Sequence, residues 1–211
     1  MEPIKYPRTR HLPWSNPSPD DEVMDDLSVF EGEDVVVTVK MDGENANLLR
    51  GLYHARSTEP ATGFDRSMVR AIHGRISHEI PEGWRICGEN VYIEHSIHYR
   101  HLKAWLYVFG IWDDLNMCLS WDETLEWCGL LDLTPVPVIY RGVWDENVLR
   151  SIPVVEYDGD EMEGFVVRVS RGFSFDEFGI SVAKYVRPDH VKSDRHWRHN
   201  TMIPNEMGGE D

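Results

Sequence analysis

The chain has 211 residues, enough for one well-buried domain, and its eight Trp and eight Tyr exclude a disordered protein. It lacks an apolar run near the ~20 residues of a membrane helix, a signal-peptide core and a C-x-x-C pair, so we expect a cytoplasmic protein with no membrane, disulfide or zinc-ribbon chemistry. The total net charge of −16 argues against a nucleic-acid partner, but phosphate contacts depend on local cations and not on the total charge.

Residues 1–30 are rich in Pro, Ser and Asp and are expected to form an irregular arm. The segment from Asp20 to Asp34 carries eight acids and no base, which indicates a solvated acidic face. Basic residues gather elsewhere, in KYPRTRH near the start and in the stretch from Lys184 to Arg198. These local patches permit a nucleic-acid partner despite the total charge.

The hydrophobic pattern predicts an α+β protein. Strands are expected over 34–40, over 46–57 as a pair broken at Gly51, and over 84–95 and 104–114. Apolar spacing predicts a helix over 65–80, and Ser120 with Glu123 in capping-box spacing predicts another over 120–131. An extended segment (134–142), a short helix (145–152) and two strands (163–170 and 181–186) follow. We therefore predict one domain, 1–211, of antiparallel sheets flanked by helices, with 188–211 as a basic C-terminal extension.

The stretch VVVTVKMDGEN places Lys40 at the end of an apolar strand. An ammonium there is costly to bury unless its pKa falls or a partner pairs with it, and a lysine tuned in this way is a nucleophile. Asp42 adds a carboxylate, and Gly43 allows the backbone to approach a ligand closely. Taken alone, K-x-D-G fits equally well a surface lysine before an ordinary Asp-Gly turn.

Further polar and aromatic residues follow Lys40 in order, each on or at the end of a predicted strand. They are Arg56 in HARS, Glu89 in CGENVY, Phe109 in WLYVFGIWD, Glu163 and Arg168 in EGFVVR, and Lys184 and Arg187 in VAKYVR. Each has an ordinary explanation by itself. Phe109 would be a core aromatic, the acids would be solvated, and Arg168 would face outward between two valines.

This order of motifs resembles that of the covalent nucleotidyltransferases, which include polynucleotide ligases and mRNA capping enzymes. The chain is most similar to ATP-dependent RNA ligases of the T4-type second RNA ligase branch and to short phage and bacterial RNA ligase domain proteins. The resemblance spans roughly Tyr6 to Trp197. It implies a nucleotidyltransferase (ATP-grasp-like ligase) domain. The stretch after Arg187 is too short for the C-terminal OB-fold of DNA ligases and capping enzymes, so we expect none.

The resemblance also implies a role for each residue. Lys40 would attack the α-phosphate of ATP and hold AMP as a phosphoramidate, while Lys184 and Mg²⁺ (or Mn²⁺) would supply cations where charge develops. Glu89 would hold the ribose hydroxyls, Phe109 would stack on adenine, and Glu163 would lie near the metal or the reactive lysine. The other implied nucleotide-binding positions are Val39, Asp42, Gly43, Asn45, Arg56, Arg168 and Arg187.

Two features depart from a simple match. The last family motif is usually K-x-K, but Val186 stands at the second lysine's position, so Arg187 is the candidate replacement. His95, His98 and His101 are spaced three apart, but no acid or Cys nearby completes a ligand set, and we do not expect a metal site there.

The implied function is an ATP-dependent RNA ligase that transfers AMP to a 5′-phosphate RNA end and joins it to a 3′-hydroxyl. RNA ends are then the partners, with Lys192, Arg195 and Arg198 as phosphate contacts. A helper protein is one way in which a chain without a C-terminal domain would engage RNA. Three alternatives stay open: a capping-type enzyme that uses GTP, a DNA-ligase-type enzyme, and a non-catalytic RNA-end-binding module.

Overall fold

The computed structural model describes residues 2–188 and 202–209, in which β-strands dominate. One set of strands is β1 (Arg10–His11), β2 (Asp34–Lys40), β9 (Val138–Val143), β12 (Gly164–Val169) and β14 (Val182–Val186). A second set is β3 (Glu44–Leu49), β4 (Leu52–Ala55), β5 (Arg85–Asn90), β6 (Leu106–Trp112), β7 (Met117–Cys118), β8 (Thr134–Pro135) and β13 (Phe173–Ser174). The strands β10 (Glu156–Tyr157) and β11 (Asp160–Glu161) form a hairpin, and the α-helices are α1 (Ser67–Ile76), α2 (Trp121–Leu130), α3 (Glu146–Ser151) and α4 (Phe178–Ser181).

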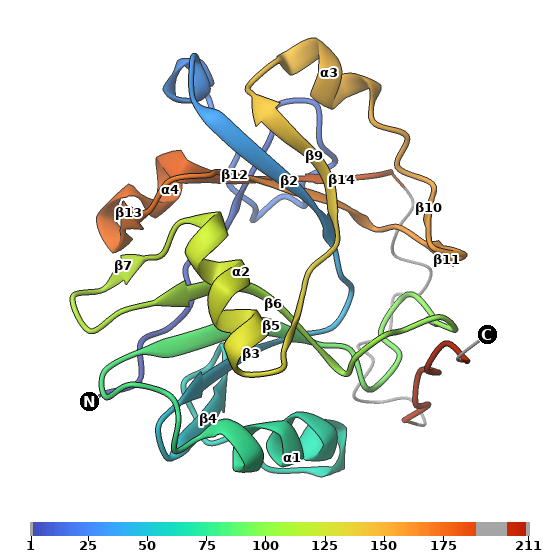
Figure 1. Ribbon diagram of the computed structural model, residues 1–211. Helices are drawn as coiled ribbons and strands as arrows, with labels where there is room; N and C mark the ends of the chain where they lie inside the picture. Colours follow the sequence, from blue (N-terminus) through green and yellow to red (C-terminus); the bar gives the residue numbers. More distant parts are fainter. Residues whose placement is uncertain (1, 189–201, 210–211) are drawn as a thin grey trace.

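Two sheets lie one above the other (Figure 1). The first has the order β1-β14-β12-β2-β9, and the second has the order β13-β7-β6-β5-β3-β4, with β8 beside β6. Neighbouring strands are antiparallel except in the pairs β1–β14 and β6–β8. The helix α1 lies beneath the second sheet, against which its apolar side packs. The predicted α+β class with antiparallel sheets is therefore confirmed.

Local signals explain most element boundaries. The predicted capping box is present at α2, where the Ser120 hydroxyl accepts from the Glu123 N–H and the Glu123 carboxylate accepts from the Ser120 N–H. The chain reverses between β3 and β4 at Gly51, whose φ is +76°. In described residues, the longest α-helices, α1 and α2, have ten residues each, and none is long and apolar enough to cross a membrane.

The strand predicted over 84–95 is too long. β5 ends at Asn90, and the chain then forms a loop that pairs with residues 202–209 instead of continuing the sheet. The Glu94 N–H donates to the Ile203 carbonyl, and the Asn205 N–H donates to the Tyr92 carbonyl, both at 2.9 Å. A contact between segments so far apart in the chain leaves no trace in local periodicity.

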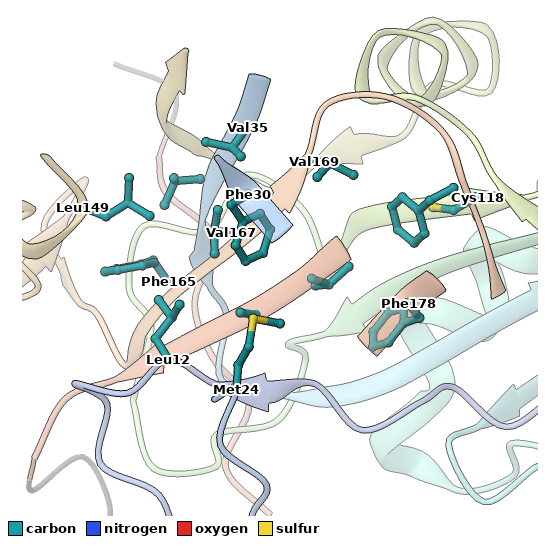
Figure 2. Packing of buried hydrophobic residues seen from close by; sticks show 14 of the residues in the cluster. Leu12, Met24, Phe30, Val35, Cys118, Leu149, Phe165, Val167, Val169 and Phe178 are labelled. Carbon is teal, nitrogen blue, oxygen red and sulfur yellow. The ribbon is translucent and has the colours of Figure 1, made fainter. Parts of the chain in front are cut away.

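The predicted irregular arm contributes to the core. Leu12 and Met24 are 0% and 2% exposed and belong to one cluster with Phe165 and Val167 of β12, as Figure 2 shows. Burial of an aliphatic side chain of this size stabilises a fold by roughly 1.5–3 kcal/mol. We call residues 6–24 the N-terminal strap, because they lie along the first sheet and are anchored to it.

Gly164 begins β12, where it lies opposite Lys40 of β2 and Val186 of β14. A Cβ at this position would collide with the Tyr185 carbonyl oxygen. We expect Gly164→Ala to lower the free energy of unfolding by about 1–3 kcal/mol, because backbone atoms must move to relieve the overlap. Chemical denaturation measures the change. Gly74→Ala in α1 is the matched control: nothing lies within 4 Å of its Cβ, so the change should stabilise by up to ~1 kcal/mol. An unchanged stability for Gly164→Ala would contradict this packing.

Candidate active site

A cavity of about 440 Å³ is lined by residues of both sheets and of the N-terminal strap. Its volume lies in the range of small-molecule and cofactor sites. Most of the predicted site residues line it: Val39, Lys40, Asn45, Arg56, Glu89, Phe109, Arg168 and Lys184. Residues far apart in the sequence thus meet in one place, as their positions at strand ends led us to expect.

Lys40 is paired with a carboxylate. Its Nζ lies 2.5 Å from Oε2 of Glu163, which directly precedes β12 and is only 7% exposed. Burial lowers the pKa of Lys40, but Glu163, Glu89 and Asp42 raise it, and the net effect is a raised pKa. Of the two ways to bury a lysine, the structure therefore shows a partner and not a lowered pKa. The amine is an ammonium here and must lose a proton before it can attack.

Glu89 lies near the Lys40–Glu163 pair, and its own pKa is raised. It faces Asn45 across the β3–β5 ladder. Burial raises the pKa of Glu89 to about 8, with Glu163 and Asp42 adding to the rise and Lys40 opposing it. Glu89 is therefore largely protonated at neutral pH, and a carboxylic acid can both donate to and accept from a hydroxyl group.

The cavity lining also includes aromatic rings. The Phe109 ring is partly exposed and meets the Tyr6 ring edge-on, with centroids 5.2 Å apart. Arg168 lies on the same side, 5% exposed, and donates to the carbonyls of Val169 and Leu119. The alternative in which Arg168 faces outward to solvent is therefore wrong. Tyr6, Phe109 and Arg168 all belong to the cavity lining.

The N-terminal strap supplies site residues that the sequence interpretation missed. Tyr6 and Asp21 line the cavity. Tyr6 accepts a hydrogen bond at its carbonyl from Arg56 Nε, and Asp21 Oδ1 lies 3.6 Å from Lys184 Nζ. Most acids of the Asp20–Asp34 segment are exposed, as predicted, but Asp21 turns inward. No local signal distinguishes Asp21 from its neighbours, because its place depends on how the strap docks.

Four predicted residues lie outside the cavity lining: Glu163, which contacts Lys40, and Asp42, Gly43 and Arg187. The Asp42 carboxylate accepts from the backbone N–H groups of residues 96 and 97, at 2.6 and 2.8 Å, so it fixes the loop after β5. A Cβ at Gly43 would collide with the Asn90 carbonyl, which gives this glycine a packing reason. Arg187 pairs with Glu161 at 2.7 Å. The predicted phosphate contacts Lys192, Arg195 and Arg198 lie outside the described residues.

Comparisons with known proteins bear on the family and the fold. The RNA ligase family model matches residues 33–186. A Naegleria gruberi RNA ligase mutant with ATP and Mn matches at a TM-score of 0.60 and 17% identity, over 91% of this chain and 62% of that chain. An archaeal ATP-dependent RNA ligase matches at 0.55 and 15%, over 86% of this chain and 48% of that chain. At these identities the likeness shows the fold, which confirms the predicted nucleotidyltransferase architecture.

The chain spans about half to three fifths of the length of these solved structures. An apo mutant of the Naegleria gruberi enzyme gives the same picture, with a TM-score of 0.56 and 16% identity over 79% of this chain and 52% of that chain. A comparison with curated protein sequences gives no match.

Proposed function

This chain belongs to the RNA ligase family, and from that premise we propose that it is an ATP-dependent RNA ligase that acts through a covalent lysyl-AMP intermediate. One observation carries the proposal. Two amines, Lys40 and Lys184, and an aromatic ring, Phe109, line one cavity, and the Glu163 carboxylate contacts Lys40. An amine nucleophile, an adjacent proton acceptor and a second cation are what attack on an α-phosphate requires.

The lining residues suggest how ATP would bind. Adenine would stack on Phe109, and the ribose hydroxyls would meet the protonated Glu89 carboxyl. The α-phosphate would then lie near Lys40 and Lys184. Solved structures with the same fold contain ATP and Mn or AMP and Mn, which supports a nucleotide in this cavity.

The first reaction is transfer of AMP to Lys40. The ammonium gives a proton to Glu163, the acceptor in contact with Nζ. A bond then forms from Nζ to the α-phosphorus, the bond from that phosphorus to the bridging oxygen breaks, and pyrophosphate leaves with the second proton lost from Nζ. Lys184 faces the charge that develops on the phosphoryl oxygens. AMP then passes to an RNA 5′-phosphate, and a 3′-hydroxyl attacks that end and displaces AMP.

A divalent metal ion fits this site only together with the nucleotide. Described residues contain no group of three or more His, Cys, Asp or Glu side chains that would hold a metal. Mg²⁺ typically uses one or two carboxylates plus substrate phosphates, and Glu163, which contacts Lys40, would supply a carboxylate. When bound, the metal would neutralise phosphate charge. We also propose that RNA ends are the substrate and that a helper protein engages them.

Incubation with ATP or GTP labelled with ³²P at the α-phosphate, followed by denaturing electrophoresis, tests the proposal. We expect protein-bound label from ATP, followed by sealing of a nicked duplex or single-stranded RNA with 5′-phosphate and 3′-hydroxyl ends. Label from GTP alone would identify a capping-type enzyme. Sealing of DNA ends only would identify a DNA-ligase-type enzyme. Folded protein without label from either nucleotide would leave an RNA-end-binding module.

Phe109→Ala should weaken ATP binding. Base stacking on an aromatic ring is worth about 1–3 kcal/mol, so the ATP concentration at half-maximal labelling should rise about 5- to 150-fold. Phe109→Tyr keeps the ring and should stay near wild type. Phe64→Ala is the matched control, because Phe64 is 58% exposed and does not line the cavity. Unchanged ATP dependence in Phe109→Ala would place the base elsewhere.

A further inference from the structure

The N-terminal strap holds the backbone of β14 on both sides of Lys184. His11 of β1 lies opposite Lys184 in a parallel register. The Leu12 N–H donates to the Lys184 carbonyl at 2.8 Å, and the Val186 N–H donates to the Ser15 hydroxyl, also at 2.8 Å. The strap thus fixes the strand that carries this lysine, although the strap precedes the matched family region at 33–186.

The strap also reaches the Lys184 side chain. Asp21 Oδ1 lies 3.6 Å from Lys184 Nζ, and Asp21 Oδ2 lies 3.2 Å from Nε2 of His11. His11 is 2% exposed, and its Nδ1 is 2.7 Å from the Ser15 hydroxyl. The Ser18 N–H donates to Asp21 Oδ2 at 3.2 Å. Asp21 Oδ2 thus lies near His11 and accepts from the Ser18 N–H, while Oδ1 is the oxygen that faces the Lys184 ammonium.

We propose that Asp21, oriented by His11, is a positioning residue that holds the Lys184 ammonium at the cavity wall, ready for the phosphate of the incoming nucleotide. The inference rests on the proposed function, because it assigns Lys184 to a phosphoryl group. At 3.6 Å the Asp21 contact is an ion pair and not a hydrogen bond, so all three N–H donors of the ammonium stay available to phosphoryl oxygens. Lysine's flexible stem would otherwise leave Nζ free to move away from the like charge of Lys40, and pre-oriented charge is what stabilises a transition state.

The test is the rate of Lys40 labelling by rapid quench across ATP concentrations. Displacement of a catalytic group by about 1 Å costs up to ~10²-fold, so Asp21→Asn should lower the maximal rate between about 10- and 100-fold. The half-saturating ATP concentration should change much less than the rate. Asp21→Glu should recover part of the rate. Asp25→Asn is the matched control, because Asp25 is an exposed acid of the same segment outside the cavity lining, and it should react at the wild-type rate.

A double-mutant cycle tests whether Asp21 acts through Lys184. In a Lys184→Met background, Asp21→Asn should cause no further loss, because the group it positions is gone. Equal losses with and without Lys184 would overturn the proposal. So would a wild-type or faster maximal rate in Asp21→Asn alone, with a faster rate identifying Asp21 as a competitor of the phosphate.

A second readout does not need catalysis. The chain has five lysines, so ¹⁵N-lysine NMR can follow the Lys184 ammonium directly. Asp21 raises the pKa of Lys184 against the lowering effect of burial, so Asp21→Asn should lower that pKa and Asp25→Asn should not. An unchanged pKa would overturn the contact itself. Wild-type protein that shows the contact but takes no label would instead refute the proposed function.

Discussion

Lys40→Ala and Lys40→Arg proteins are both expected to lose label from ATP by at least ~10³-fold, the scale seen when a catalytic nucleophile is removed. Alanine has no amine to attack. Arginine retains a cation for Glu163, but its guanidinium stays protonated at any usable pH and is not a nucleophile. Denaturing electrophoresis after incubation with labelled ATP measures both losses.

The arginine variant separates chemistry from stability. Lys40→Ala leaves the buried Glu163 carboxylate without this partner, which costs up to ~3–5 kcal/mol where a buried pair is broken. Lys40→Arg keeps the charge pair and should unfold near the wild-type denaturant concentration. Label that persists in a folded Lys40→Arg protein would show that another residue is the nucleophile.

Lys184→Met should slow labelling of Lys40 about 10²–10³-fold at saturating ATP, the usual effect of removing one group that stabilises developing charge. Methionine fills similar space without the cation, so the strand itself should persist. Rapid-quench measurement of label on Lys40 gives the rate, and Lys184→Arg should recover part of it because the charge returns.

The control for Lys184 is Lys103→Met. Lys103 is exposed, pairs with Asp158, and does not line the main cavity. It should react at the wild-type rate, so a general effect of lost positive charge would appear in both variants. A Lys184→Met protein with the wild-type maximal rate would remove Lys184 from the reaction.

The strands that carry Lys40, Glu89 and Phe109 can be predicted from the sequence alone. The apolar runs predict the strands, and the structure has Lys40 at the end of β2, Glu89 next to the end of β5 and Phe109 within β6, because such runs are local properties of the sequence. The same holds for α2, whose capping box is contained in four consecutive residues. The RNA ligase family follows from the order of these motifs, which the family match bears out.

The protonation, the contacts and the burial of these residues cannot be predicted from the sequence, because they depend on segments that are far apart in the chain. Burial lowers the pKa of Lys40, but the carboxylates of Glu163, Glu89 and Asp42 raise it overall, whereas burial is the main cause of the raised pKa of Glu89. Asp42 binds loop amides, and Asp21 turns into the cavity because the strap docks on β14. These contacts join segments that are far apart in the chain, and they use backbone groups that every residue type except proline carries in full. No local sequence pattern therefore predicts that residues of the N-terminal strap belong to the site.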